Sequence, residues 1–463
     1  MTPAIVGLGS NLGNRVANIR SALLALNALP TTAVKATSFL YDSEPWGTST
    51  RQPRFLNTVC LIETQLHHRD LLQHLKSIES GLGRDLSAAR GSPRPIDLDI
   101  IASGDSVVSQ PDLVIPHALA HQRAFVLRPW ADIQPDYSVP GHGLTVSKLL
   151  DQLPAEQQMQ ICRIIPIGDS IFRLGTRTFI IGIVNVTPDS FSDGGQFYDS
   201  NLAAEHAELL WRQGADIVDV GGQSTRPGAE PVSVEAELER VIPVIERIRS
   251  VNPSILISID TFHARVAEES VRSGAHVIND VSGGNADPDM LKVAAKLQVP
   301  YVCMHMRGDP ASMTKLNQYN NLHEEIADSI ESCCQRAMRH GLFRYNLLAD
   351  PGIGFAKNAE QNVELLRTKP HWTWPSLIGP SRKRFLGLIT GKSEARDRDW
   401  GTAAAISASV AAGYDFVRVH NVSAAVDVCR VADAIWKPSS NPKDSIYPAS
   451  SESTHSETLD FRV

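Results

Sequence analysis

The chain has 463 residues, of which 42% are hydrophobic and 21% charged, and its net charge is −7. This length predicts about three domains, or two if one of them is a large barrel. The acidic balance argues against a nucleic-acid partner, because nucleic-acid-binding surfaces are basic. No apolar run is long enough to cross a bilayer, so we expect no membrane partner. Met1 is followed almost at once by a strand-like segment, so we expect no presequence and a cytoplasmic rather than mitochondrial location.

The first half of the chain predicts a ferredoxin-like α+β domain with an antiparallel sheet and helices on one side. Two connections, 42–54 and 87–95, are long and rich in Gly, Pro and Ser, which is typical of mobile binding loops. The segment GLGSNLG at 7–13 lacks the third glycine of a dinucleotide-binding motif, so it predicts only a glycine-rich turn. The expected strands are 4–9, 34–41, 55–64 and 96–101, and the expected helices are 15–29 and 70–80.

Two carboxylates stand out in the segment RPIDLDI at 94–100. Strand alternation places Asp97 and Asp99 on one face, where their charges repel unless a cation lies between them. A hard divalent metal is the natural partner, although a solvated strand face is the simpler alternative for an isolated D-x-D. Arg84, Arg90 and Arg94 surround the pair, and metal-binding carboxylates with phosphate-binding arginines are what nucleotide phosphoryl transfer requires.

The second half alternates buried strands with amphipathic helices, which predicts a (β/α)₈ barrel. A barrel gathers the carboxyl ends of all eight strands on one face, so polar residues at those ends share one pocket. The acids and amides suit a heterocycle rich in N–H groups, and the cations suit an anionic tail. The expected strands are 179–186, 215–220, 255–260, 276–280, 300–305, 346–350, 376–379 and 416–419. The polar residues at their ends are Asn185, Asp219, Asp260, Asn279, His305, Asp350, the run 381–383, Arg418 and His420.

The N-terminal motifs GLGSNLGN, FLNTV, SPRPIDLDI and VIPHALAHQRAFVLRP resemble the 6-hydroxymethyl-7,8-dihydropterin pyrophosphokinase family. The resemblance implies that Asp97 and Asp99 hold two Mg²⁺ ions that bridge the phosphates of ATP. The chain departs from many relatives at Gly91, where an aromatic residue is common. ATP contacts are implied for Arg84, Arg94, His117 and Arg123, and pterin contacts for Ser43, Pro45, Phe55, Asn57 and Phe125.

The C-terminal motifs NVTPDSFSDGG, DVGGQSTRPGA, INDVSG, ADPGIGFAK, GPSRKRF and RVHNV resemble dihydropteroate synthases. The resemblance implies that Asn185 binds one Mg²⁺ on the pterin pyrophosphate. Phosphate contacts are implied for Arg226, Arg418 and His420. Pterin contacts are implied for Asp260, Asn279, Met304, Asp350, Phe355 and Lys383, and a p-aminobenzoate site for Phe191, Thr225, Pro227 and Ser381.

Together these features predict a bifunctional enzyme of folate biosynthesis. We expect a pyrophosphokinase domain at 1–156, a linker at 157–177, a barrel domain at 178–437 and a disordered tail at 438–463. The small-molecule partners would be ATP, hydroxymethyldihydropterin and p-aminobenzoate, with a homo-oligomer through the barrel as a further possibility. The alternatives are a reduced-pterin methyltransferase barrel, which would have no pyrophosphate for Lys383, Arg418 and His420 to hold, and a non-catalytic pterin-binding scaffold.

Overall fold

The computed structural model describes residues 1–47, 51–89, 91–187, 200–224 and 232–437. The tail predicted to be disordered, 438–463, lies outside this part of the chain. Among the described helices, none combines the length and the apolar character needed to cross a membrane.

The N-terminal sheet is antiparallel and has the strand order β5-β1-β4-β3-β8-β9, with β2 paired to β4. The central strands pair in the ferredoxin-like manner, as predicted, with β1 between β4 and β5. The elements are β1 (Thr2–Ser10), α1 (Arg15–Asn27), β2 (Thr32–Thr37), β3 (Leu40–Ser43), β4 (Phe55–Thr64), α2 (His68–Gly81), β5 (Asp97–Ser103), β6 (Val108–Gln110), β7 (Leu113–Ile115), α3 (Ala124–Ala131), α4 (Val146–Asp151) and α5 (Ala155–Met159).

Two details of this domain differ from the prediction. The strand expected over 34–41 is split into β2 and β3, because the Ser38 hydroxyl accepts the Val59 N–H at 3.0 Å in place of a regular strand–strand bond. Helices cover both faces of the sheet rather than one. The second face carries Ile5 and Ile101, which are buried against α3 and its fully buried Trp130.

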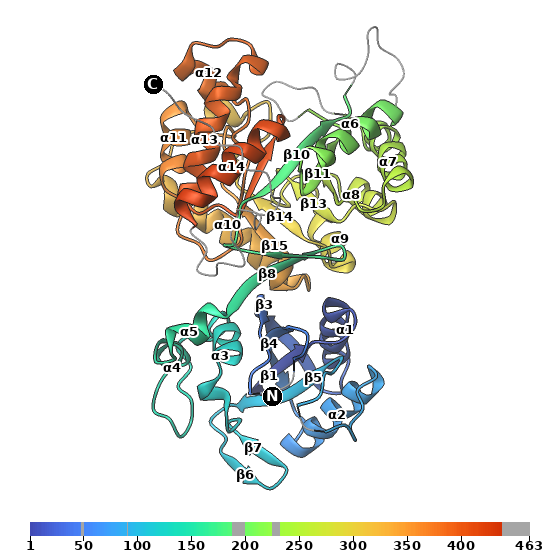
Figure 1. Cartoon of the computed structure of the whole chain (residues 1–463), viewed down its shortest axis with the longest axis vertical. Coiled ribbons are helices and arrows are strands. Elements are labelled where there is room, and N and C mark those ends of the chain that lie inside the picture. Colours follow the sequence, from blue (N-terminus) through green and yellow to red (C-terminus); the bar gives the residue numbers. More distant parts are fainter. Residues whose placement is uncertain (48–50, 90, 188–199, 225–231, 438–463) are drawn as a thin grey trace, which may run out of the picture.

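The predicted linker contains a β-hairpin made of β8 (Ile161–Ile167) and β9 (Ser170–Arg173). The first half of β8 pairs antiparallel with β3 and so extends the N-terminal sheet. Beyond it, Ile167 and Phe172 pack under the barrel, where the Phe172 and Phe179 rings lie 4.8 Å apart. The hairpin therefore belongs to both halves of the molecule and lies between them in Figure 1. The Gly168-Asp169 turn between two apolar runs is the sequence signal that identifies such a hairpin.

Further contacts join the two halves beside the hairpin. The Arg344 N–H of the barrel donates to the Thr37 hydroxyl at 3.1 Å. The rings of Phe39 and Trp374 meet edge to face at 5.5 Å. Arg163 of β8 lies 4.1 Å from the Phe39 ring centre. The junction is thus built from buried aromatic rings and guanidinium groups.

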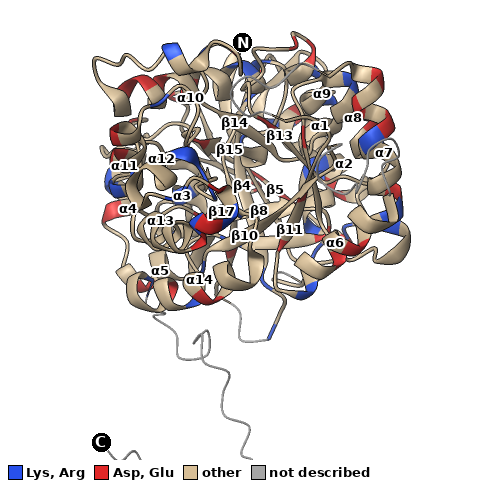
Figure 2. Ribbon diagram, turned by 90° about the horizontal axis from the view of Figure 1, so that it is seen from above, with Lys and Arg blue, Asp and Glu red and all other residues tan. Residues whose placement is uncertain are grey.

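The barrel has eight parallel strands in the order β15-β14-β13-β12-β11-β10-β17-β16, and a parallel bridge between Ala349 and Ser376 closes it. Figure 2 looks down onto the barrel and shows acidic and basic residues interspersed around the ring of helices. The strands are β10 (Phe179–Asn185), β11 (Ile217–Gly221), β12 (Ile257–Asp260), β13 (Val277–Asp280), β14 (Tyr301–Met304), β15 (Leu347–Asp350), β16 (Leu377–Ile378) and β17 (Phe416–Val419). The helices are α6 (Ser200–Arg212), α7 (Val234–Val251), α8 (Ala264–Arg272), α9 (Met290–Leu297), α10 (Leu322–Arg339), α11 (Ala359–Arg367), α12 (Arg384–Thr390), α13 (Asp399–Ala411) and α14 (Val422–Trp436).

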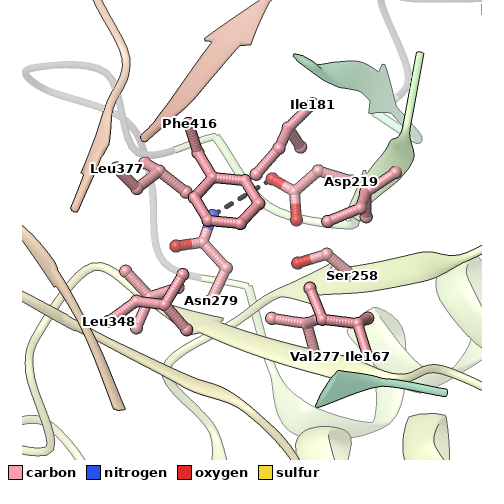
Figure 3. A pocket seen from close by; sticks show the side chains of 11 residues that line it. Ile167, Ile181, Asp219, Ser258, Val277, Asn279, Leu348, Leu377 and Phe416 are labelled. Carbon is pink, nitrogen blue, oxygen red and sulfur yellow. Dashed lines mark hydrogen bonds between the residues drawn. The ribbon is translucent and has the colours of Figure 1, made fainter. Parts of the chain in front are cut away.

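Side chains fill the centre of the barrel. The cavity left there measures only about 10 Å³ and is lined mainly by apolar residues, with Ile167 entering from β8 (Figure 3). Asn279 and Asp219 face each other at its upper side, where the Asn279 amide donates to the Asp219 carboxylate at 3.1 Å. The barrel interior is therefore a packed core, and the space for a ligand lies beyond the carboxyl ends of the strands.

Candidate active sites

The N-terminal domain encloses a cavity of about 640 Å³ above β1, β4 and β5. Gly9 of β1 forms part of its floor between Asn57 and Asp97, and a Cβ atom there would lie 3.3 Å from the Asn57 amide oxygen. The structure brings the predicted residues of this domain together around one space, except Pro45, which does not line it. The lining includes the predicted Ser43, Phe55, Asn57, Arg84, Arg94, Asp97, Asp99, His117, Arg123 and Phe125, and also Trp46, Gln52 and Lys76.

Asp97 and Asp99 project from alternate positions of β5 into this cavity, as strand geometry predicts. Asp97 forms ion pairs with Arg84 and, at 3.0 Å, with Arg94. Burial and the neighbouring Asp97 charge raise the pKa of Asp99. Within the described residues no group of three or more acidic, histidine or cysteine side chains is arranged to hold a metal by itself. Two carboxylates still fit Mg²⁺, which is commonly held by one or two carboxylates together with substrate phosphates and water.

Glu79 is a supporting residue to which the sequence assigned no role. Its buried carboxylate, on α2, accepts the Leu98 N–H at 2.7 Å and an Arg84 N–H at 2.5 Å. Lys76 approaches the same carboxylate at 3.0 Å. Glu79 thus fixes Arg84 beside Asp97 and ties α2 to the strand that carries the two aspartates. The sequence signal was its position within α2, five residues before Arg84.

Glu79→Gln is expected to destabilise the protein by about 3 kcal/mol, because it removes the charge of a buried group that pairs with two cations. Urea unfolding monitored by circular dichroism measures the change. Glu63→Gln is the matched control, since Glu63 forms an exposed pair with Lys35 at 3.3 Å and should change stability by less than about 1 kcal/mol. Equal stability of the two variants would contradict the supporting role.

Aromatic rings and small polar groups also line this cavity. The buried Asn57 amide donates to the Ser43 hydroxyl at 2.9 Å. The Arg123 guanidinium lies 5.2 Å from the Trp46 ring centre and 5.6 Å from that of Phe125. This arrangement offers flat apolar surfaces for a ring system next to cationic groups for phosphates.

The two long loops predicted to bind ligands meet through Gln52. Its side-chain amide donates to the Gly91 carbonyl at 2.7 Å and accepts from the Asn11 amide at 3.3 Å. Asn11 in turn accepts the Arg94 N–H at 2.8 Å. Gln52 therefore links the described ends of both loops to the floor of the cavity.

In the barrel, the predicted polar residues gather at the carboxyl ends of the strands, where a network of ion pairs holds them. The Arg418 guanidinium donates to Asp219 at 2.6 Å and to Asp260 at 2.7 Å. Burial raises the pKa of Asp260 to about 7, although the Arg418 charge opposes this. The Ser381 hydroxyl and His420 Nδ1 lie 2.9 Å apart, which brings the loop after β16 to the end of β17. Arg382, next to Ser381, is held away from this group by a two-point ion pair with Asp399, at 2.7 and 3.0 Å.

A second group at the same end combines one acid with an apolar surface. Met304 and Phe355 belong to one buried apolar cluster. The Lys383 ammonium lies 4.2 Å from the centre of the Phe355 ring. Asp350 accepts the Gly352 N–H at 2.7 Å, and burial raises its pKa to about 6. Asn185 ends β10 at the same mouth of the barrel.

Four predicted site residues, Phe191, Thr225, Arg226 and Pro227, lie outside the described residues, and their roles remain predictions.

Sequence profiles match both halves of the chain. The family described as "Pterin binding enzyme" matches residues 181–420, and "7,8-dihydro-6-hydroxymethylpterin-pyrophosphokinase (HPPK)" matches residues 5–135. The chain is 41% identical over 468 residues to the "Folate synthesis bifunctional protein, mitochondrial" of Pisum sativum, with 95% of the chain and 90% of the relative covered. The chain belongs to the bifunctional folate synthesis proteins.

This family assignment confirms the predicted pairing of a pyrophosphokinase domain with a pterin-binding barrel. The fold also agrees with a crystal structure of Plasmodium falciparum HPPK-DHPS that contains pterin and p-hydroxybenzoate. The TM-score is 0.81, the match covers 96% of this chain and 97% of the other, and the two sequences are 24% identical. The chain is 42% identical to the folic acid synthesis protein fol1 of Pneumocystis carinii and spans 60% of its length. The word "mitochondrial" in the pea protein's name describes that protein, and the location of this chain stays a prediction.

Proposed function

We propose that the chain catalyses two consecutive steps of folate synthesis. In the first, the hydroxyl oxygen of 6-hydroxymethyl-7,8-dihydropterin attacks the β-phosphorus of ATP, the bond from that phosphorus to the oxygen bridging the α- and β-phosphorus atoms breaks, and AMP and one proton leave. In the second, the amine of p-aminobenzoate attacks the activated methylene carbon, the carbon–oxygen bond breaks, and pyrophosphate and one proton leave with dihydropteroate as product. The observation that carries the proposal is the cavity in which Asp97 and Asp99 face the arginines Arg84, Arg94 and Arg123.

The first step would depend on charge placement in that cavity. Asp97 and Asp99 would hold two Mg²⁺ ions, which supply positive charge to the phosphate oxygens when bound. Arg84, Arg94, His117 and Arg123 line the same space and would hold ATP. Ser43, Asn57, Phe55 and Phe125 would hold the pterin on the aromatic side, whereas Pro45, two residues after Ser43, does not line the cavity.

The second step would use the mouth of the barrel. Asp260, Asn279 and Asp350 would hydrogen-bond the pterin, and Met304 and Phe355 would pack on its ring. Lys383, Arg226, Arg418 and His420 would stabilise the departing pyrophosphate, with Asn185 binding one Mg²⁺. Phe191, Thr225, Pro227 and Ser381 would border p-aminobenzoate. No side chain needs to form a covalent bond to the substrate in either step.

We also propose that two copies of the chain associate through the barrel. Large apolar side chains are exposed on the neighbouring helices α12, α13 and α14, including Leu388, Trp400 and Trp436, and Trp400 is 89% exposed. Large apolar side chains exposed on neighbouring helices are typical of a protein interface. Sedimentation equilibrium tests the proposal, and a protein that stays monomeric at micromolar concentration would contradict it.

The proposed function is tested by incubating the protein with hydroxymethyldihydropterin, ATP, Mg²⁺ and p-aminobenzoate. AMP and dihydropteroate should form together, and dihydropteroate should need all four components. Formation of AMP without dihydropteroate would support the first activity and contradict the second.

The raised pKa of Asp350 predicts a pH effect on pterin binding to the barrel. The ionised carboxylate can accept two N–H groups from a pterin, whereas the protonated form has lost part of that capacity. Because burial raises the Asp350 pKa to about 6, affinity should fall as the pH drops below about 6. Titration calorimetry with 6-hydroxymethylpterin between pH 5 and 8 measures the effect. Asp350→Asn should bind weakly with a flatter profile, and a wild-type affinity that is constant down to pH 5 would contradict the prediction.

A further inference from the structure

Lys357 has surroundings that are unusual for a lysine. Its ammonium lies 3.0 Å from His305 Nδ1, 3.1 Å from the Gly352 carbonyl oxygen and 3.0 Å from the Phe355 carbonyl oxygen. Three acceptors match the three N–H groups of the protonated amine, although burial lowers the pKa of Lys357 to about 7. These hydrogen bonds include no carboxylate, so the group is not part of a hydrogen-bonded ion pair.

His305 takes part as a neutral acceptor. It is buried, and burial lowers its pKa to about 2. Because Nδ1 accepts from Lys357, the ring proton lies on Nε2. The sequence placed His305 among the polar residues at the carboxyl ends of the barrel strands, and this contact gives it a structural role there.

The loop that Lys357 holds has an uncommon backbone. Gly352, Gly354 and Ala356 have φ angles of +69°, +80° and +48°, so every second residue is left-handed. A Cβ on Gly352 would lie 2.1 Å from the His305 carbonyl oxygen, which requires glycine there. The carbonyl oxygens of Gly352 and Phe355 both accept from the Lys357 ammonium, which closes the loop through them.

This loop touches three residues of the proposed pterin site. The Gly352 N–H donates to Asp350, Phe355 belongs to the loop itself, and a Cβ on Gly354 would lie 2.9 Å from Lys383 Cδ. The position of the loop backbone therefore sets where the acid, the ring and the lysine lie relative to one another. A displacement of about 1 Å in such a group can cost about 10²-fold in rate.

We propose that Lys357 is a positioning residue for the pterin site, acting through the carbonyl oxygens of the 352–355 loop. It touches no substrate in this role. The inference rests on the proposed dihydropteroate synthesis and adds to it the residue that shapes one wall of the pterin site.

The test compares Lys357→Met with Lys369→Met in the full-length enzyme. Lys369 is also partly buried and donates to a carbonyl, that of Gly413 at 3.0 Å, but it lies at the opposite end of the barrel strands. Lys357→Met should raise the KM for the pterin pyrophosphate at least ~10-fold, and of the two dissociation constants for 6-hydroxymethylpterin only that of the barrel site should rise by a similar factor. The KM for p-aminobenzoate and the rate of AMP release should stay within about twofold of wild type. Lys369→Met should change the melting temperature as much as Lys357→Met does. It should leave the pterin dissociation constant, both KM values and the rate of AMP release near those of wild type.

Two further variants complete the test. Lys357→Arg keeps the charge and several N–H donors, so it should recover part of the pterin affinity that Lys357→Met loses. Lys357→Gln, which has a single amide group, replaces Lys357→Met if that protein does not fold. A pterin dissociation constant within twofold of wild type in the folded Lys357→Met or Lys357→Gln protein overturns the proposal. An equal loss in every constant together with a lower melting temperature also overturns it. Wild-type enzyme that forms no dihydropteroate would instead overturn the proposed function, while calorimetry with the pterin would still test the role of Lys357.

Discussion

Asp97→Asn is expected to reduce AMP formation from ATP and hydroxymethyldihydropterin by at least ~10²-fold. The substitution keeps the size of the side chain but removes one of two neighbouring negative charges in the cavity. It also removes the partner of Arg84 and Arg94, which both pair with Asp97 in the structure. The substitution therefore lowers metal affinity and removes the ion pair that orients Arg94, while Arg84 keeps its pair with Glu79.

Asp112→Asn is the matched control for this experiment. Asp112 lies in the same domain and pairs with Arg69 at 3.1 Å, but both side chains are more than half exposed and lie away from the cavity. Its AMP formation should stay within twofold of wild type. An Asp97→Asn enzyme with undiminished AMP release would refute the metal site.

Lys383→Ala is expected to stop dihydropteroate formation while AMP release continues. Lys383 lies against Phe355 at the mouth of the barrel, where its charge would stabilise the leaving pyrophosphate. The N-terminal cavity contains no part of this loop. The pyrophosphorylated pterin should therefore accumulate, which chromatography of the reaction mixture would show. Lys292→Ala, which removes an exposed lysine paired with Asp289 on α9, should behave like wild type.

A mixture of Lys383→Ala and Asp97→Asn proteins should form dihydropteroate, since each supplies the step that the other lacks. The barrel interior is packed, and the N-terminal domain contacts the end of the barrel opposite to its mouth (Figure 1). The intermediate must then pass around the outside of the barrel. A mixture that makes no product, although each protein keeps its own step, would show that the intermediate does not exchange between molecules.

Much of the barrel could be predicted because its strands are continuous apolar runs. Each predicted strand overlaps an observed one, and six of them, β10 and β13 to β17, agree within one residue at each end. Parallel strands buried on both faces leave this pattern in any sequence. The positions of polar residues at strand ends then follow from the geometry of the fold.

The contacts between those residues could not be predicted, because they join distant parts of the chain. Arg418 pairs with Asp219 and Asp260, which are 199 and 158 residues away. In the sequence, Lys357 resembles an ordinary surface lysine just before a helix. In the structure, the turn of the loop directs its ammonium toward His305. Such roles depend on three-dimensional position, which periodicity does not encode.

The hairpin of β8 and β9 has a practical consequence for dissecting the protein. Its first half completes the edge of one sheet, its tip seals the base of the barrel, and Arg173 binds the buried Asp42 at 2.9 Å. A barrel fragment that begins at 178 would expose Phe179 and Phe416 to water. A pyrophosphokinase fragment that ends at 156 would leave β3 as an unpaired edge strand. Two soluble half-proteins therefore require overlapping boundaries, each carrying its own copy of residues 161–173.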